Sequence, residues 1–452
     1  MKRTAICAAL ILSCTLSFAQ DIVKTGLNFG PLPAIAYDAD KGFQYGAILN
    51  IFNYGDGTNY PNYDSKMYFE ASFFTKGSKL LQFMYDDKNL FPGIRWSSAI
   101  TAEFDKAMDF YGFNGYQSYY DWESVDAGKN GDSYIFTPFY RFSRTSVRAK
   151  SDFIGNITEN LQWELGLHLS YFKTGAIDRD NINKGKKEGK EYPDNESTLF
   201  EQYVNWGLIT PEEADGGFST SLRAGLVYDT RDKEGAPSKG IWAEGHVIAA
   251  PGFLSTIGYA RYSLTWRHYL PIVKNDVLTF AYRLNYEGNF GESCPFYVLP
   301  YITVMGENSD KDGMGGFRTV RGVMRDRVVG LDMATYTAEM RWRFARFHMG
   351  KQNIALGLSA FSDGSMVTRG RDMTIKSDLL RERDINSLYR NVPTDAKESM
   401  HSTVGAGFRF IMNENFIVAA EYGTPFSHLN KNSAHYNQDG SGAFYINIGY
   451  LF

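Results

Sequence analysis

The sequence FYINIGYLF, residues 444–452, ends the chain, and every even-numbered residue in it is apolar: Phe444, Ile446, Ile448, Tyr450 and Phe452. Side chains of a β-strand point alternately to its two faces, so this segment has one apolar, aromatic-rich face and one mixed face. In a lipid bilayer every backbone N–H and C=O group must be paired, so a strand crosses a membrane only within a closed barrel. The segment therefore predicts the last strand of a transmembrane β-barrel, with an edge strand of a soluble sandwich as the alternative.

The same alternation recurs along the chain, with the charged residues confined to one face of each segment. Between residues 335 and 344, Glu339 and Arg341 share one face, whereas Trp342 lies on the other face among apolar residues. A soluble two-sheet core also alternates, but it rarely places Arg and Glu beside rows of exposed aromatic residues. Alternation of this kind is found in the segments 161–171, 278–287 and 335–344.

We therefore predict an all-β fold, a transmembrane antiparallel β-barrel of sixteen strands. The expected strands are 32–38, 43–53, 67–75, 79–87, 94–107, 133–155, 159–172, 218–230, 239–250, 257–270, 277–290, 334–346, 353–362, 402–412, 416–424 and 443–452. The segment 133–155 is long enough for two strands. Four long connections, 108–132, 173–217, 291–333 and 363–401, all follow odd-numbered strands. Short periplasmic turns and long outer loops are typical of outer-membrane barrels, so the loop lengths support the strand count.

Residues 1–20 are predicted to be a signal peptide, and residues 21–452 an outer-membrane β-barrel domain. The first segment begins with two basic residues, contains an apolar stretch too short to span a membrane as a helix, and ends with the small-x-small cleavage site Ser17-Phe18-Ala19. A lipoprotein signal ending at Cys14 is the alternative, although Leu12 fits that motif poorly.

The composition and the missing motifs argue against several classes of protein. The formal net charge of −4 argues against a nucleic-acid partner. No run of about 18 apolar residues follows the signal segment, so no spanning helix is expected. No Gly-x-Ser-x-Gly motif is present and the seven histidines lack His-x-x-x-His spacing, so we expect neither an enzyme nor a metal or cofactor site. Because Cys7 and Cys14 leave with the signal peptide, Cys294 remains without a partner for an intrachain disulfide.

Three short motifs carry a resemblance to a known family. The first consists of Tyr228, Asp229, Thr230, Arg231 and Asp232, followed by Pro237, Ser238, Lys239 and Gly240. The second, in the long connection 291–333, consists of Gly315, Gly316, Val320, Arg321 and Gly322. The third consists of Phe361, Ser362, Asp363 and Gly364. In this order the motifs resemble the barrel of the BamA/TamA superfamily of outer-membrane insertases and two-partner secretion translocators, the bacterial surface antigen type of barrel.

The resemblance implies that the sixth outer loop, 291–333, folds into the barrel lumen and brings Arg321 to a carboxylate on the wall. Asp363 is the first candidate partner and Glu339 the second, because both occupy lumen-facing positions near the loop. An arginine buried in a lumen requires carboxylate partners, preferably bidentate ones; a solvated loop arginine is the alternative. Val323 stands where the family usually has Phe or Tyr, so we expect the aromatic packing behind Arg321 to be lost.

The resemblance also implies a function. The periplasmic polypeptide-transport-associated (POTRA) repeats of the family are not recognised in the sequence, so we expect a barrel-only member, an accessory factor in outer-membrane protein assembly and insertion. Its expected partners are the lipid bilayer, other outer-membrane assembly subunits and unfolded barrel clients. The alternatives are an outer-membrane pore or transporter, and a structural scaffold that binds a partner through its outer loops.

The first and last predicted strands carry residues that weaken strand pairing. The first strand is expected to be short, with Pro33 inside it and Pro31 just before it, and the last strand contains Gly449. Proline has no N–H to donate and is tolerated mainly at sheet edges or strand starts. We therefore expect the barrel to close at a weak seam, with prolines that merely mark the strand entry as the alternative.

Deletion of Phe452 is expected to lower the yield of membrane-inserted barrel. The apolar row from Phe444 to Phe452 resembles the sorting signal that the outer-membrane assembly machinery reads, and Phe452 is its last member. The yield is measured in outer-membrane fractions, with Leu451→Ala, on the opposite face of the strand, as the control. An unchanged yield after the deletion would count against this role.

Overall fold

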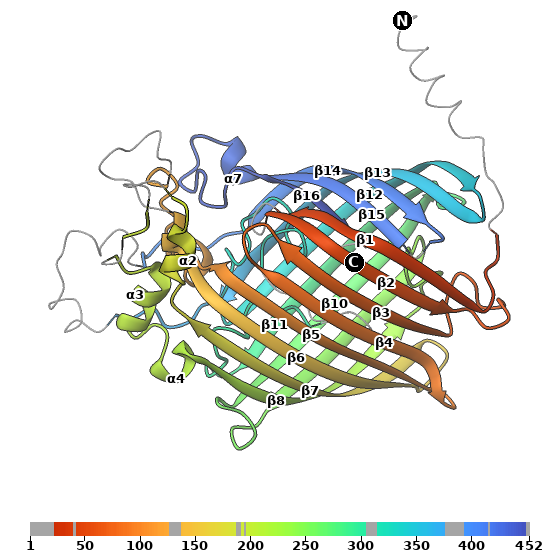
Figure 1. Cartoon of the computed structure of the whole chain (residues 1–452), viewed down its shortest axis with the longest axis horizontal. Helices are drawn as coiled ribbons and strands as arrows, with labels where there is room; N and C mark the ends of the chain where they lie inside the picture. Colours follow the sequence, from red (N-terminus) through yellow and green to blue (C-terminus); the bar gives the residue numbers. More distant parts are fainter. Residues whose placement is uncertain are drawn as a thin grey trace, which may run out of the picture.

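The chain folds into a closed barrel of antiparallel strands (Figure 1). The computed structural model describes residues 22–38, 42–125, 137–186, 191–193, 196–303, 314–375, 393–414 and 416–448. Each strand pairs with its sequence neighbours, and β1 pairs with β16 to close the barrel. The predicted fold class, an antiparallel barrel of sixteen strands, is confirmed.

The strands are β1 (Leu27–Asp38), β2 (Gly42–Asn53), β3 (Ser65–Phe74), β4 (Lys79–Phe91), β5 (Ile94–Asp109), β6 (Arg141–Asn156), β7 (Leu161–Gly175), β8 (Gly216–Asp229), β9 (Gly240–Ala250), β10 (Tyr259–Val273), β11 (Leu278–Phe290), β12 (Asp332–Met349), β13 (Gln352–Arg369), β14 (His401–Met412), β15 (Phe416–Pro425) and β16 (Ala443–Ile448). The short helical turns are η1 (Gly115–Gln117), η3 (Thr137–Tyr140), α2 (Arg179–Asn183), α3 (Leu199–Asn205), α4 (Pro211–Ala214) and α7 (Phe426–Leu429).

Two predicted boundaries require correction. The segment 133–155 contributes a single strand, β6, which follows the helical turn η3. β13 continues to Arg369, so Asp363 lies well inside this strand and not at its end. The pairing of β13 with β12 explains the extension, because the register runs as far as Asp332↔Arg369. A long neighbouring strand thus extends β13 beyond the part that shows clear alternation.

The two faces of the barrel wall differ as the alternation predicted. In β7, Leu165 is exposed on the outside, whereas Glu164 and His168 are buried on the lumen side. Buried charges of the lumen form pairs, as at Asp152, which accepts from Arg223 Nη2 at 3.0 Å and lies 2.8 Å from His168 Nε2. Ionised groups are tolerated in such an interior only when they are paired in this way.

The two ends of the barrel also differ. In Figure 1, α2, α3 and α4 lie together beyond one end of the strands, where the long connections gather. Side chains of these connections form the largest apolar cluster among the described residues, which includes Phe110, Tyr203 and Leu299. At the other end most connections are short, such as 92–93, 157–160 and 350–351, although 54–64 and 230–239 are longer. Since short turns mark the periplasmic end of such barrels, the apolar cluster forms a cap at the outer end.

The barrel closes between its first and last strands, β1 and β16. Twelve register pairs, from Leu27↔Asn53 to Asp38↔Gly42, join β1 to β2. β1 pairs with β16 at Tyr37↔Ile446, and β16 is described as far as Ile448.

The expectation of a short first strand is wrong. β1 is a 12-residue strand that begins at Leu27, so Pro31 and Pro33 both lie within it. Its complete pairing with β2 extends it, and prolines two residues apart remove N–H donors that would face the same neighbouring strand. Gly449, the other predicted seam residue, lies outside the described residues.

Candidate functional site in the barrel lumen

Of the two described parts of the sixth outer loop, the second, residues 314–331, is buried inside the barrel. Met314, Val320 and Val328 have an exposed fraction of 0% and pack against Met333 of β12 and Val367 of β13. The loop therefore fills part of the lumen, as the motif predicted.

Three glycines with positive φ allow the loop to turn: Gly315, Gly316 and Gly322. Gly322 lies directly against the wall, because a Cβ there would be 2.5 Å from the backbone carbon of Gly423 in β15. Only glycine adopts this backbone conformation without strain and lets the loop approach the wall so closely.

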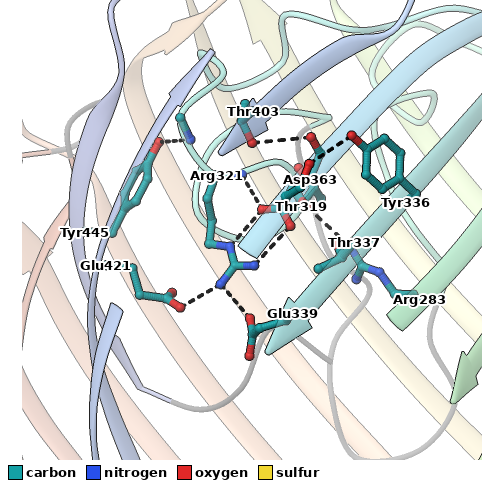
Figure 2. Close-up of polar contacts among 12 residues, drawn as sticks. Arg283, Thr319, Arg321, Tyr336, Thr337, Glu339, Asp363, Thr403, Glu421 and Tyr445 are labelled. Atoms are coloured by element: carbon teal, nitrogen blue, oxygen red, sulfur yellow. Dashed lines mark hydrogen bonds and ion pairs between the residues drawn. The ribbon is translucent and has the colours of Figure 1, made fainter. Parts of the chain in front are cut away.

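Arg321 lies at the centre of a network of three carboxylates (Figure 2). Its Nε donates to Asp363 Oδ2 at 2.8 Å and its Nη2 to Asp363 Oδ1 at 3.0 Å, which is a bidentate pair. Its Nη1 donates to Glu339 Oε2 at 2.9 Å and to Glu421 Oε1 at 2.6 Å. The exposed fraction of Arg321 is 0%, so its guanidinium is satisfied entirely by the protein. Both carboxylates predicted from the sequence contact it.

Sequence reasoning missed several members of this network. Glu421 of β15 was not among the predicted partners, although it is the one charged residue in that strand. Arg409 of β14 donates to Glu421 Oε1 at 2.8 Å and also pairs with Glu339. Arg341 donates to Glu339 Oε1 at 2.7 Å. With Arg321 and Asp363 the cluster holds three arginines and three carboxylates, and this balance reduces the cost of burying them.

The expected loss of aromatic packing behind Arg321 is wrong. Val323 is buried in the apolar cluster of the loop. The aromatic contact comes instead from Phe361 of β13, whose ring centroid lies 3.4 Å from the guanidinium carbon of Arg321. A guanidinium over an aromatic face is an attractive arrangement, and it is stronger where water is excluded.

The last strand contacts the same loop. Tyr445 points inward, is 1% exposed, and its hydroxyl accepts from the Gly322 N–H at 3.2 Å. Phe444 is exposed on the outer face, in keeping with the alternation of the terminal segment, and Ile446 is partly exposed. Of the remaining predicted sorting residues, the Ile448 side chain and the residues Tyr450 and Phe452 lie outside the described part of the chain.

The mid-barrel signature forms a separate group of contacts around the turn between β8 and β9. Tyr228 is exposed on the outer face near the end of β8. Asp229 holds Arg231 in a bidentate pair, Nε to Oδ1 and Nη2 to Oδ2, each at 3.0 Å. Gly240 has a φ of 104°, and a Cβ there would lie 2.2 Å from the carbonyl oxygen of Thr230. These residues build the turn.

Within the described ranges, no group of three or more His, Cys, Asp and Glu residues is arranged to hold a metal ion. No helix in the same part of the chain is long and apolar enough to cross a membrane.

The geometry defines a class of protein: a sixteen-stranded barrel whose sixth outer loop is anchored in the lumen by a buried arginine. The family model for the Omp85 superfamily domain matches residues 95–452, and the chain belongs to this superfamily of outer-membrane barrels.

Solved structures with the same fold include BamA from Haemophilus ducreyi lacking POTRA domains 1–3, with a TM-score of 0.50 and 16% identity. The match covers 94% of this chain and 70% of that chain. CdiB from Escherichia coli has a TM-score of 0.50 and 9% identity, and the match covers 95% of this chain and 63% of CdiB. A search of curated proteins found no match. At these identities the likeness is one of fold.

The Arg321→Ala variant and the Asp363→Ala variant should each have a less stable folded barrel than the native protein. Either change leaves a buried charge without its main partner, which costs on the order of 3 kcal/mol. Because the two residues contact each other, the double variant should lose less than the sum of the two single losses. Denaturant unfolding of the purified barrel measures this, with Arg318→Ala in the same loop as the control. Additive losses, or losses no larger than that of the control, would show that the pair does not anchor the loop.

Proposed function

We propose that this protein is an accessory factor in the assembly and insertion of outer-membrane proteins. The observation that carries the proposal is the composition of β1, the strand that closes the barrel against β16: its residues Pro31 and Pro33 have no N–H to donate to a neighbouring strand. Each hydrogen bond that a proline cannot donate removes roughly 1 kcal/mol of net stabilisation. A wall of this kind opens sideways at modest cost and offers a strand edge to an incoming strand.

The filled lumen supports the same proposal. Arg321 and its partners hold the sixth loop inside the barrel, and the lumen charges around Asp152 and Arg223 are paired and buried. A lumen filled in this way conducts solutes poorly, which favours a role at the barrel wall over a role as a pore.

The proposal also states where the protein is located and which partners it has. We place it in the bacterial outer membrane as an integral barrel that is exported by a cleaved signal peptide. Its partners are the lipid bilayer, unfolded barrel clients and other assembly subunits, and its role involves no catalysis.

A structural scaffold is the second candidate function, and the outer cap is the observation that favours it. The connection between β7 and β8 contains α2, α3 and α4, and the α3 N-terminus is closed by a capping box of Thr198 and Glu201. Arg371 of the seventh loop forms a bidentate pair with Glu213 of α4, at 2.7 and 3.1 Å. Outer loops ordered in this way offer a defined surface to a partner.

A disulfide across the seam should separate the candidate functions. Tyr37 and Ile446 are register partners, so cysteines at both positions have the separation that a disulfide requires. If the seam opens during assembly, Tyr37→Cys/Ile446→Cys should lower the amount of other outer-membrane barrels in cells, and a reductant should restore it. The readout is the abundance of folded client barrels in outer-membrane fractions.

The matched control is Ile35→Cys/Tyr45→Cys, which joins β1 to β2 at a register pair on the same outer face. This control should leave client assembly unchanged. Normal client assembly in cells with a fully oxidised seam would rule out the proposed function. Release of a bound partner after shortening of the 176–215 connection, with client assembly intact, would support the scaffold.

A further inference from the structure

The turn between β8 and β9, residues 230–239, extends across the periplasmic end of the barrel. It contacts Lys88 of β4 and Arg95 of β5 on one side. On the other side it contacts Arg343 of β12 and Glu414, which follows β14. In the strand order of the barrel, β8 and β9 lie between these two groups. A turn that reaches both groups must cross the lumen axis.

Glu234 makes the contacts on the first side. Its Oε1 accepts from Lys88 Nζ at 2.7 Å, and its Oε2 lies 3.4 Å from Arg95 Nη2. Its backbone N–H donates to Asn62 Oδ1, in the connection between β2 and β3, at 3.4 Å. Arg95 is held in turn by a bidentate pair with Asp86, with both distances 2.8 Å. The first side of the wall therefore presents a positioned positive charge to the turn.

Lys233, the preceding residue, makes the contacts on the opposite side. Its Nζ donates to Asp276 Oδ2 at 2.6 Å and lies 3.5 Å from Glu414 Oε2. Burial raises the pKa of Asp276, but the neighbouring Lys233 charge outweighs this effect, and the pKa lies at about 2. Asp276 is therefore ionised at neutral pH and can hold Lys233.

The tip of the turn packs against the same side of the wall that Lys233 contacts. Ala236 is 1% exposed and packs against Ala355 of β13, Ile411 of β14 and Ile417 of β15. Arg343 Nη2 donates to the Ala236 carbonyl at 3.3 Å. The tip is thus packed against the inner wall and is not a solvated turn at the rim.

The turn is also stiffened from within. Asp232 Oδ1 accepts from the N–H groups of Ser238 at 2.9 Å and Lys239 at 3.1 Å, and its Oδ2 accepts from the Ser238 hydroxyl at 2.6 Å. Arg231 lies over the Trp242 ring, with its guanidinium carbon 4.1 Å from the centroid. The mid-barrel signature recognised in the sequence therefore supplies the frame of a rigid turn.

We propose that the β8–β9 turn is a plug that seals the periplasmic mouth of the lumen against water-soluble molecules. Lys233 and Glu234 carry opposite charges and hold the turn through ion pairs to opposite sides of the wall. Movement of the turn toward either side breaks the ion pairs on the other side. This inference concerns access to the lumen and does not depend on the proposed role in assembly.

Access to the lumen is measured with a cysteine reporter in the full-length barrel. Ser359 of β13 is 6% exposed and lies opposite Arg341 of β12, on the lumen side. The barrel carrying Ser359→Cys and Cys294→Ala is treated with a charged, membrane-impermeant methanethiosulfonate reagent. The rate at which the reagent modifies the cysteine at position 359 is followed. The variants are Lys233→Gln/Glu234→Gln, and a barrel in which two glycines replace residues 233–237. Glu159→Gln, in the exposed turn between β6 and β7, is the matched control.

The intact protein and the Glu159→Gln control should be modified slowly at the reporter. The Lys233→Gln/Glu234→Gln variant should react on the order of tenfold faster, equivalent to about 1.4 kcal/mol of bias toward the closed state, and the shortened turn faster still. The folding of each variant is checked by the heat-dependent shift of its band in SDS gels. If the barrel with the shortened turn does not fold, the Lys233→Gln/Glu234→Gln variant still tests the proposal. The proposal is overturned if the intact protein reacts as fast as Thr158→Cys at an exposed turn. It is equally overturned if the charge variant reacts at the rate of the control.

Discussion

The buried guanidinium of Arg321 is the constraint on which the rest of the lumen depends. A charge with an exposed fraction of 0% must be neutralised by the protein, and here Asp363, Glu339 and Glu421 supply the compensation from β13, β12 and β15. The loop has to enter the barrel to bring Arg321 to these carboxylates, and the strands have to present them on the inner face. One requirement for charge compensation thus fixes the loop position and the register of three strands.

This anchoring makes the barrel wall uneven. The strands from β12 to β15 are tied together by the charge network as well as by their ladders, whereas none of the residues of this network belongs to β1. Gly322 and Tyr445 extend the tied region to the inner face of β16. The partner strand β1, with Pro31 and Pro33, lies beyond it. The proposed function rests on this part of the wall, where β1 closes the barrel outside the region that the charge network ties together.

The sequence was informative where a feature depends on local periodicity. Alternation and loop lengths predicted the strand number. The family resemblance implied that Arg321 enters the lumen, and lumen parity then indicated Glu339 and Asp363 as its partners. Glu421 was missed because it is 100 residues from Arg321 in the sequence, and only the closed barrel brings them together. The aromatic contact with Arg321 that was expected from position 323 of the loop comes from Phe361 of β13. No local sequence pattern indicates this substitution. The reach of the β8–β9 turn across the periplasmic mouth, and the length of β1, likewise depend on partners distant in the sequence.

Hydrogen exchange of the sixth-loop amides tests the central claim most directly. The Arg321 N–H donates to Asp363 Oδ2 at 3.1 Å, and the Gly316 N–H donates to the Val323 carbonyl at 2.8 Å. If charge compensation holds the loop in the lumen, both amides should exchange slowly in the native barrel and much faster in Asp363→Asn, while the amides of β12 and β13 stay protected. Rapid exchange of these loop amides in the native protein, or equal protection in Asp363→Asn, would contradict the account.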